Sequence, residues 1–246
     1  NYYTEMSSVK FDDPGAELGL AIGFYTEKGL EKENLGAIQR FSCLADFPSE
    51  FAYDWAHELA LALRTDALNG LFYSIWWSGI LNGPLDLGGL AGGAGLPIPV
   101  DTMTLDMSFL APPVINDCSK ASGVEIQVGD LFLDLAGSLL GIELDADAYV
   151  DLSLLASFKT KEEGFYIEVG DLKNFDVEVV DVGPNADYEE MRSLLEDELP
   201  SILAAFLVGQ EFGPIALPEI DLGDSVPGVP EGSVLEFQDL EISKSS

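Results

Sequence analysis

Residues 144–158 keep one apolar face over eight alternate positions, from Leu144 to Phe158. The positions between them include Asp145, Asp147 and Asp151. This period of two is typical of a β-strand with one buried and one solvated face. At about 3.3 Å per residue such a strand approaches about 50 Å, whereas most strands have only about five or six residues. A strand of this length predicts an elongated, strongly twisted sheet.

Other segments with the same alternation extend the predicted sheet. Residues 124–135 alternate in two runs, and the phase changes at Gly129 and Asp130. A polar turn around Asp171 and Asn174 is expected to separate two later strands. Besides the long strand at 144–158, strands are predicted at residues 18–25, 35–44, 58–64, 103–109, 124–135, 165–169, 175–182, 215–222 and 234–242.

Two segments show the period of a helix. The first, residues 66–81, begins at Asp66, which can cap the first turn, and the Gly83-Pro84 pair forbids its continuation. Its apolar residues surround most of the helix, so sheet or ligand must cover most of its sides. The following residues 83–100 are rich in glycine and proline and predict a flexible connection or a loose sheet edge.

The second helical segment, residues 187–208, has an acidic first turn, which suits the positive end of a helix dipole. An apolar stripe follows from Met191 to Phe206. Pro200 in its middle removes one backbone hydrogen bond and predicts a bend. We therefore expect this helix to follow a curved surface.

These elements predict an α+β fold in which a long, highly twisted antiparallel sheet wraps around a long proline-bent helix and a shorter apolar helix. Residues 51–246 are expected to form this barrel-like domain. Residues 1–50 are expected to be N-terminal strands, in a central sheet or linker region that continues into a larger protein. The start at Asn1, without a methionine or a signal-like segment, is consistent with a processed or excised chain.

The charge of the chain excludes one class of partner. Eleven Lys and Arg stand against 44 Asp and Glu, so the formal net charge is −33. Such a charge repels nucleic-acid phosphates and anionic bilayer surfaces. The acidity suits solubility, adaptation to high salt, or binding of hard cations such as Ca²⁺.

The sequence offers little metal or redox chemistry. Cys43 and Cys118 lack the spacing of a zinc site. We predict one disulfide between them in an exported protein, with two buried thiols as the alternative. The strand aspartates do not match an EF-hand loop, although Asp134, Asp145 and Asp147 could approach across strands and bind Ca²⁺ weakly. A solvated strand face is the preferred interpretation, and no cofactor is predicted.

Common catalytic signatures are also missing from the sequence. The single histidine, His57, lies in no GxSxG, HExxH or phosphate-loop motif, and we interpret it as an ordinary polar residue at a strand start. No carboxylate pair stands out among the 44 acids. We therefore predict no enzymatic activity and no catalytic residue. No run of about 18 or more apolar residues predicts a membrane span.

Several strings resemble a known family. The strand-to-helix segment 59–81 and the proline-bent helix with its Phe-Gly-Pro turn and terminal strand, residues 198–222, resemble the BPI-like or tubular lipid-binding (TULIP) superfamily. The resemblance is in particular to the C-terminal barrel of bactericidal/permeability-increasing protein and its relatives. PPVI at 112–115 and GDLFLDL at 129–135 match a strand start and a long strand of that family. The resemblance covers about residues 57–242.

The resemblance implies a curled sheet that encloses a groove for acyl chains. Groove candidates on the first helix are Leu68, Leu71, Phe72, Ile75 and Trp76. On the second helix they are Met191, Leu194, Leu195, Leu199, Ile202, Leu203 and Phe206. We expect about half of them to be plain core. The basic tips of endotoxin-binding members have no counterpart here, and the family's disulfide lies in another domain, so a Cys43–Cys118 bond would be a separate solution.

We thus expect non-enzymatic binding or transfer of a lipid or another apolar small molecule, in an extracellular, periplasmic or cell-surface setting. A second domain, or a homodimer formed through the N-terminal strands, is a further expected partner. The alternative is a structural or adhesive domain, with or without stabilising Ca²⁺, whose groove is filled by its own side chains. Retained lipid distinguishes the two hypotheses, because only an open groove would hold it.

Overall fold

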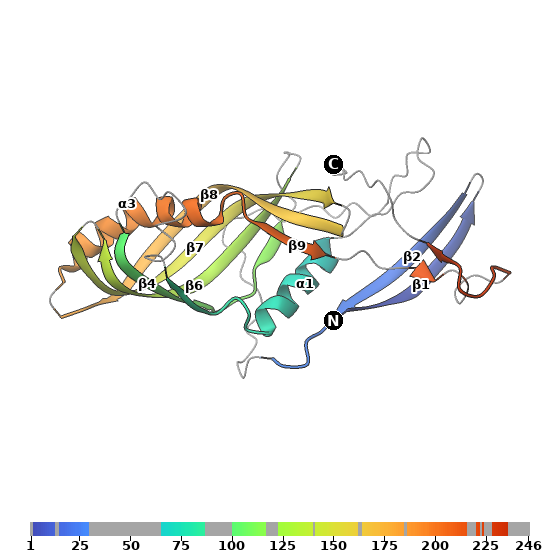
Figure 1. The fold of residues 1–246 in the computed structure, drawn as a ribbon, viewed down its shortest axis with the longest axis horizontal. Helices are drawn as coiled ribbons and strands as arrows, with labels where there is room; N and C mark the ends of the chain where they lie inside the picture. The colour runs from blue at the N-terminus through green and yellow to red at the C-terminus, as the bar shows by residue number, and fades with distance from the viewer. Residues whose placement is uncertain are drawn as a thin grey trace.

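The fold is α+β, built on a strongly curled antiparallel sheet that wraps half a barrel (Figure 1). Two helices are described, α1 (Thr65–Trp77) and α3 (Tyr188–Leu207), as predicted from the helical periodicity. The computed structural model describes residues 2–12, 15–29, 65–86, 100–116, 123–139, 141–161, 164–184, 186–215, 220–221, 223 and 228–235.

The curled sheet has seven strands in the order β3-β4-β6-β7-β8-β9, and β5 also pairs with β6. Its longest strand has 20 residues and contains residues 144–158, where the alternation predicted a long strand. The strand bounds are β3 (Gly83–Asp86), β4 (Val100–Phe109), β5 (Val114–Asn116), β6 (Val124–Leu139), β7 (Ile142–Lys161), β8 (Gly164–Val182) and β9 (Glu211–Ile215).

The predicted change of phase in β6 is confirmed as an irregularity in its pairing with β7. The register shifts between Val128 and Leu131. Asp130 there has φ 50°, and its N–H donates to Oδ1 of Asp151 over 2.8 Å. The extra residue at this bulge keeps the apolar residues of both halves of β6 on the inner face of the sheet.

The predicted turn around Asp171 and Asn174 is wrong, because β8 is one continuous strand of 19 residues. The pairing with β7 continues through this polar stretch, with Ser153 opposite Asn174 and Leu154 opposite Leu172. Register shifts on either side of Leu154 absorb the residues that interrupt the alternation. A break in hydrophobic phase therefore marks bulges here and not a chain reversal.

The first helix ends at Trp77, before the predicted end at Leu81. Gly79 takes φ 76°, and its N–H donates to the carbonyl of Trp76 over 2.9 Å, which closes the helix with a tight turn. Glycine adopts this left-handed conformation without strain. Ile80 and Leu81 continue the apolar pattern in the sequence, but they lie in this turn.

The second helix agrees with its prediction at both ends. Asp187 caps it, because its Oδ1 accepts a hydrogen bond from the N–H of Glu190 over 3.0 Å. Pro200 lies inside the helix, as expected from the sequence. In Figure 1 α3 lies across the curled sheet, far from the N-terminal end of the molecule.

The strand after α3 was only partly predicted. The predicted strand over residues 215–222 begins too late, because β9 (Glu211–Ile215) already contains the Phe-Gly-Pro segment that was expected to form a turn. β9 pairs with the first part of β8, with Phe165 opposite Ile215 and Ile167 opposite Phe212. Four of its five residues are exposed, so this edge strand lacks the alternation that sequence reasoning requires. Beyond it, β10 (Ile220–Asp221) pairs with β11 (Val234–Leu235).

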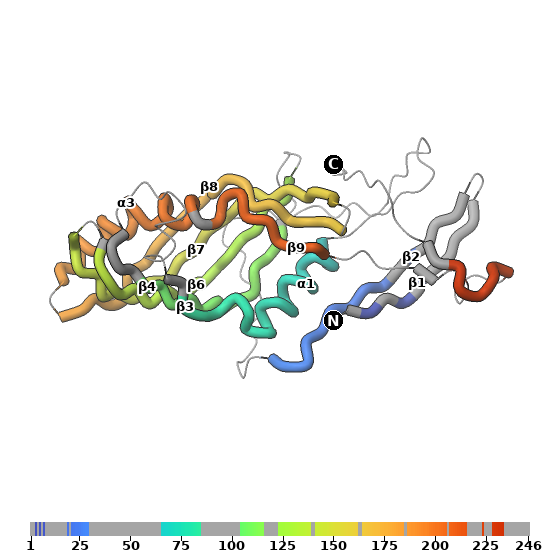
Figure 2. Tube along the Cα trace, in the orientation of Figure 1, coloured from blue at the N-terminus to red at the C-terminus, as the bar shows by residue number. Residues whose placement is uncertain are grey.

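The N-terminal residues form a separate hairpin of β1 (Tyr2–Asp12) and β2 (Gly15–Phe24), which confirms the strand predicted at 18–25 (Figure 2). The hairpin meets α1 where a Cβ at Gly70 would contact the Phe24 ring. Beyond β2, Gly29 lies so close to the Trp77 ring that a side chain there would overlap it. The strands predicted at 35–44 and 58–64, together with His57, Cys43 and Cys118, lie outside the described residues.

Asn69 of α1 fastens the helix to β5. Its Nδ2 donates to the carbonyl of Ile115 over 3.3 Å, and its Oδ1 accepts from the N–H of Ile115 over 2.6 Å. The side chain thereby satisfies both backbone groups of a strand residue that point away from β6.

Replacing Asn69 with alanine is expected to lower the free energy of unfolding by about 1 to 3 kcal/mol, because both backbone groups of Ile115 lose their partner. Chemical denaturation of the purified protein measures this change. Ser74→Ala on the same helix is the control and should have a smaller effect. Equal stability of Asn69→Ala and wild type would show that the pair of bonds is not needed.

Candidate apolar binding site

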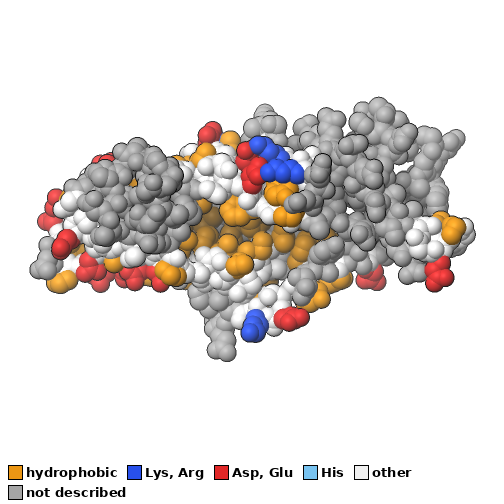
Figure 3. Space-filling model, in the orientation of Figure 1, with side chains coloured by type: hydrophobic (Ala, Val, Ile, Leu, Met, Phe, Trp, Pro, Cys, Tyr) orange, Lys and Arg blue, Asp and Glu red, His pale blue; other side chains and the backbone are white. Residues whose placement is uncertain are grey.

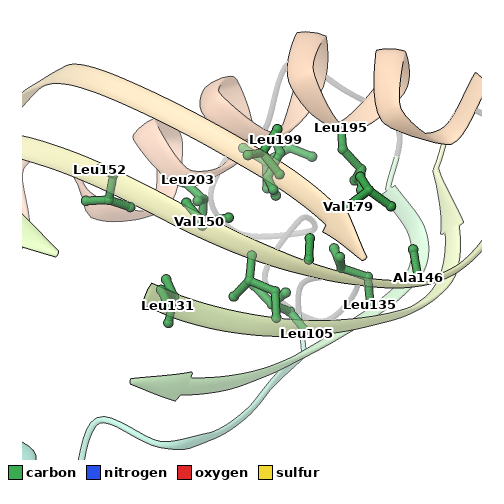
Figure 4. Close-up of a cluster of buried hydrophobic side chains, with 14 of the residues drawn as sticks. Leu105, Leu131, Leu135, Ala146, Val150, Leu152, Val179, Leu195, Leu199 and Leu203 are labelled. Carbon is green, nitrogen blue, oxygen red and sulfur yellow. The ribbon is translucent and has the colours of Figure 1, made fainter. Parts of the chain in front are cut away.

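The inner face of the sheet carries two clusters of buried apolar side chains. The α3 cluster joins α3 to β4, β6, β7 and β8, and Figure 4 shows Leu195, Leu199 and Leu203 directed toward sheet residues such as Val150 and Leu135. The α1 cluster consists of Leu68, Ile115, Val124, Ile126, Ala156 and Ile167. The two helices thus cover neighbouring parts of one apolar surface.

Most of the groove candidates on α3 are enclosed by protein. Leu195 and Leu199 are 0% exposed, so no part of their surface is reachable by a water molecule, and no space wide enough for an acyl chain borders them. Leu194 is partly buried at the margin of the α3 cluster, and the side chain of Phe206 is not described. The other buried candidates on this helix are Met191, Ile202 and Leu203.

The groove candidates on α1 belong to a different environment from those on α3. Leu68 is a member of the α1 cluster, and Phe72 packs against this cluster while remaining partly buried. Trp76 is 1% exposed, and its Nε1–H donates to the carbonyl of Phe109 over 2.7 Å. Leu71 and Ile75 are half-buried. The candidates of the two helices are therefore not gathered around one common slot.

A hollow with hydrophobic walls opens between the two helices instead (Figure 3). In the view of Figures 1 and 3 it lies between β9 and α1. Leu207 at the end of α3, Ile215 at the end of β9 and Phe72 on α1 are partly buried apolar residues of these bordering elements. We take this hollow as the candidate site.

Strand residues also lie on the inner face where the two clusters meet. On β6, Ile126 belongs to the α1 cluster and Val128 to the α3 cluster, so the boundary between the clusters crosses this strand. Val128 is 7% exposed, whereas Leu133 beneath α3 is 0% exposed. The alternation already placed these residues on the inner face. The resemblance pointed only to helix residues as a lining, whereas the alternation identifies these strand residues.

Charged groups at the β7 end of the sheet are paired. The Nζ of Lys159 lies 2.5 Å from Oε1 of Glu168, and Lys161 pairs with Glu211 of β9. The buried members of both clusters are all apolar. The described residues around the hollow therefore favour an uncharged ligand over an anionic ligand.

A row of aspartates lies on the opposite, outer face of the sheet. Asp106, Asp134, Asp147 and Asp181 are direct cross-strand neighbours on β4, β6, β7 and β8. Burial, and next the carboxylates of Asp134, Asp181 and Asp145, raise the pKa of Asp147 above its ordinary value. Like charges directly opposite one another on a sheet destabilise it. This row therefore lowers the stability of the sheet at neutral pH.

Asp134 lies opposite Asp147 on the neighbouring strand, as the sequence analysis allowed. Asp145 lies opposite Ala136 and not within the row. Among the described residues no three His, Cys, Asp or Glu side chains form a group that could hold a metal ion. Neither described helix is long and apolar enough to cross a membrane.

Replacing Asp147 with asparagine is expected to raise the melting temperature at pH 7. The pKa of Asp147 is raised in the folded state, so its ionised form opposes folding, and wild type regains stability as the pH falls through that pKa. At pH 7 the free energy of unfolding of the variant should exceed that of wild type by about 0.2 to 1 kcal/mol for each pair of opposed carboxylates that it relieves. On acidification the variant should gain less stability than wild type does. Thermal melts between pH 7 and pH 4 measure both effects.

Asp197→Asn on α3 removes the same charge away from the row and serves as the control. A variant Asp147→Asn that melts below wild type at pH 7 would contradict the proposed repulsion.

No known relative contributes to the assignment of this site. Comparisons of the chain with protein families, with curated proteins and with solved structures found no match. The likeness to the BPI-like superfamily rests on segments such as 59–81 and 198–222 and stays a prediction. The function of the hollow therefore has to be inferred from its residues.

Proposed function

We propose that this protein binds a lipid or another apolar ligand in the hollow between α1, the end of α3 and β9, without chemical conversion of that ligand. The observation that carries the proposal is the hydrophobic lining of this hollow (Figure 3), in a chain with a formal net charge of −33. An open apolar surface is unfavourable in water unless a ligand or partner covers it.

Elementary energetics make lipid binding feasible. Burial of an acyl chain contributes about 0.8 kcal/mol per methylene, so about ten covered methylenes supply about 8 kcal/mol before ordering costs. This free energy corresponds to about micromolar affinity. A hollow that covers only part of a chain is therefore sufficient for retention during purification.

We further propose that the fold is a member of the BPI-like, tubular lipid-binding type. A sheet that curls through half a barrel and a helix with an internal proline against its inner face support this proposal. The acidic outer row of Asp106, Asp134, Asp147 and Asp181 argues against the anionic ligands of endotoxin-binding members.

Lipid that co-purifies with gently prepared protein tests the proposal. Mass spectrometry of an organic extract should identify at least one apolar compound in a defined ratio to protein. Empty extracts, together with no uptake of a fluorescent fatty acid by delipidated protein, would remove the basis for a carrier function.

Ile215→Trp is expected to place a larger side chain at the border of the hollow and to reduce uptake of the fluorescent fatty acid. Displacing two or three methylenes removes about 2 kcal/mol, or about thirtyfold in affinity. Titration of the delipidated protein measures the change. Val180→Trp is the matched control, because Val180 is 45% exposed on β8. Equal uptake by both variants would place the ligand elsewhere.

A scaffold with a filled interior is the second candidate function. Its support is the complete enclosure of Leu195 and Leu199, two residues that a wide groove along α3 would have exposed. On this hypothesis the hollow near α1 is a surface depression, and Ile215→Trp leaves the protein without any binding signal to lose. Substitution of Leu195 itself does not separate the two functions, because an enclosed residue affects folding in both cases.

A further inference from the structure

Phe212 of β9 is an exposed aromatic residue on a border of the hollow. Its side chain is 52% exposed, although aromatic side chains usually bury a large apolar area in folded proteins. Phe212 lies directly opposite Ile167 of β8. Cross-strand partners project to the same face of a sheet, and Ile167 belongs to the α1 cluster, so the Phe212 side chain lies on the inner face.

The charged residues next to Phe212 lie on the other face of the sheet. Glu211 precedes Phe212 and lies opposite Glu168. Glu211 pairs with Lys161, and Glu168 with a second lysine, Lys159. Because successive side chains of a strand alternate between the two faces, both ion pairs belong to the outer face. The exposed surface of Phe212 therefore faces the apolar side of the sheet.

Backbone hydrogen bonds hold the start of β9 in place. The N–H of Gly209 donates to the carbonyl of Val169 over 2.7 Å, and the N–H of Val169 donates to the carbonyl of Gln210 over 2.9 Å. The pairing of Phe212 with Ile167 follows directly after these bonds. A ring on such a fixed backbone loses less freedom on ligand binding than a ring on a mobile loop.

Other phenylalanines lie on the same part of the inner face. Phe72 of α1 and Phe158 of β7 pack against the α1 cluster and remain partly buried. Phe158 also meets Phe165 of β8 edge to face, with ring centroids 6.2 Å apart. Among the described residues, two of the three partly buried ones at the α1 cluster are phenylalanines, against two of eight at the α3 cluster. The apolar surface beside the hollow is thus the more aromatic of the two.

The extent of the open surface disfavours a long acyl chain. Leu195 and Leu199 of α3 are 0% exposed, so the hollow does not continue along this helix. An acyl chain longer than the hollow leaves methylenes in water, and its bound part loses rotational freedom. A compact ring system avoids both costs, because it is rigid and fits its apolar area into a short hollow.

We propose that the hollow selects a compact, uncharged ligand with an aromatic ring system over an open acyl chain, and that Phe212 determines this selectivity. The inference rests on the proposed apolar-binding function, because it names the ligand class of the same hollow. Phe72 on α1 packs against the cluster that contains Ile167, and Phe212 on β9 is the cross-strand neighbour of Ile167. A flat ligand between these two borders contacts rings from both, and each aromatic pair adds affinity beyond the area that it buries.

A second copy of the chain explains the exposure of Phe212 less well. Among the described strands β9 is an edge of the curled sheet, has only five residues and contains Pro214. Pro214 has no N–H to donate to a further strand, and strand addition depends on such main-chain bonds. A small ligand needs only the side-chain surface.

Titration calorimetry of the delipidated protein with two neutral probes tests the selectivity. 1-Naphthol carries a fused aromatic ring, and 1-heptanol is an open-chain alcohol of similar partition into octanol. Wild type is expected to bind 1-naphthol about three- to tenfold more tightly than 1-heptanol. Phe212→Leu should lose this preference and keep its affinity for 1-heptanol within about twofold, because leucine retains an apolar surface without a ring.

Two further variants are the controls. Phe212→Tyr keeps the ring and should keep the preference. Phe132→Leu makes the same change on the outer face, where the Phe132 ring lies 5.4 Å from that of Tyr149, and should bind both probes as wild type does. Melting temperatures show whether each variant is folded.

The inference is overturned if wild type binds 1-heptanol as tightly as 1-naphthol, if Phe212→Leu keeps the preference, or if Phe132→Leu loses it equally. Failure of both probes to bind, or a dimer in solution that Phe212→Leu dissociates, also contradicts it. The organic extract of gently prepared protein is analysed in parallel. Open-chain lipid in that extract, without a preference for 1-naphthol, leaves the apolar-binding function standing, whereas empty extracts and no uptake of any probe remove both proposals.

Discussion

The apolar inner face of β6, β7 and β8 is the constraint on which the rest of the fold depends. These strands have 16, 20 and 19 residues, and their inner residues stay apolar through the bulge at Val128 and Leu131. A surface of this length has to be covered along its whole extent. α3 covers one part and α1 the next, and the hollow lies between β9 and α1, where neither helix covers the sheet.

Charge is distributed so that it supports this arrangement. The carboxylates of Asp106, Asp134, Asp147 and Asp181 lie in one row on the outer face, where their repulsion opposes folding. The sheet tolerates the row because the burial of the inner face is a larger favourable contribution. The same segregation leaves the segments around α1 without charge, so apolar contacts at that end meet little electrostatic opposition.

Much of the fold could be predicted from periodicity, but the lining of the site could not. The long strand, the phase change in β6 and the capped helix α3 each follow from a local signal. The start of β9 was missed because its first four residues are exposed, and the end of α1 was missed because Gly79 closes the helix while the apolar pattern continues. Periodicity shows that Leu195 is buried, but it does not show whether protein or ligand buries it.

The two helices differ in how much of their apolar surface the protein itself uses. α3 buries Met191, Leu195, Leu199, Ile202 and Leu203 against the sheet, whereas α1 buries only Leu68 and Trp76. α1 therefore depends more on hydrogen bonds from its side chains to the backbones of β4 and β5, and it keeps half-buried apolar residues along its length. Hydrogen bonds hold α1 in place while its apolar surface stays partly exposed. This combination suits a site that binds and releases an apolar ligand. In the proposed site α3 would be the fixed wall, and α1 the wall at which a ligand would replace missing protein contacts.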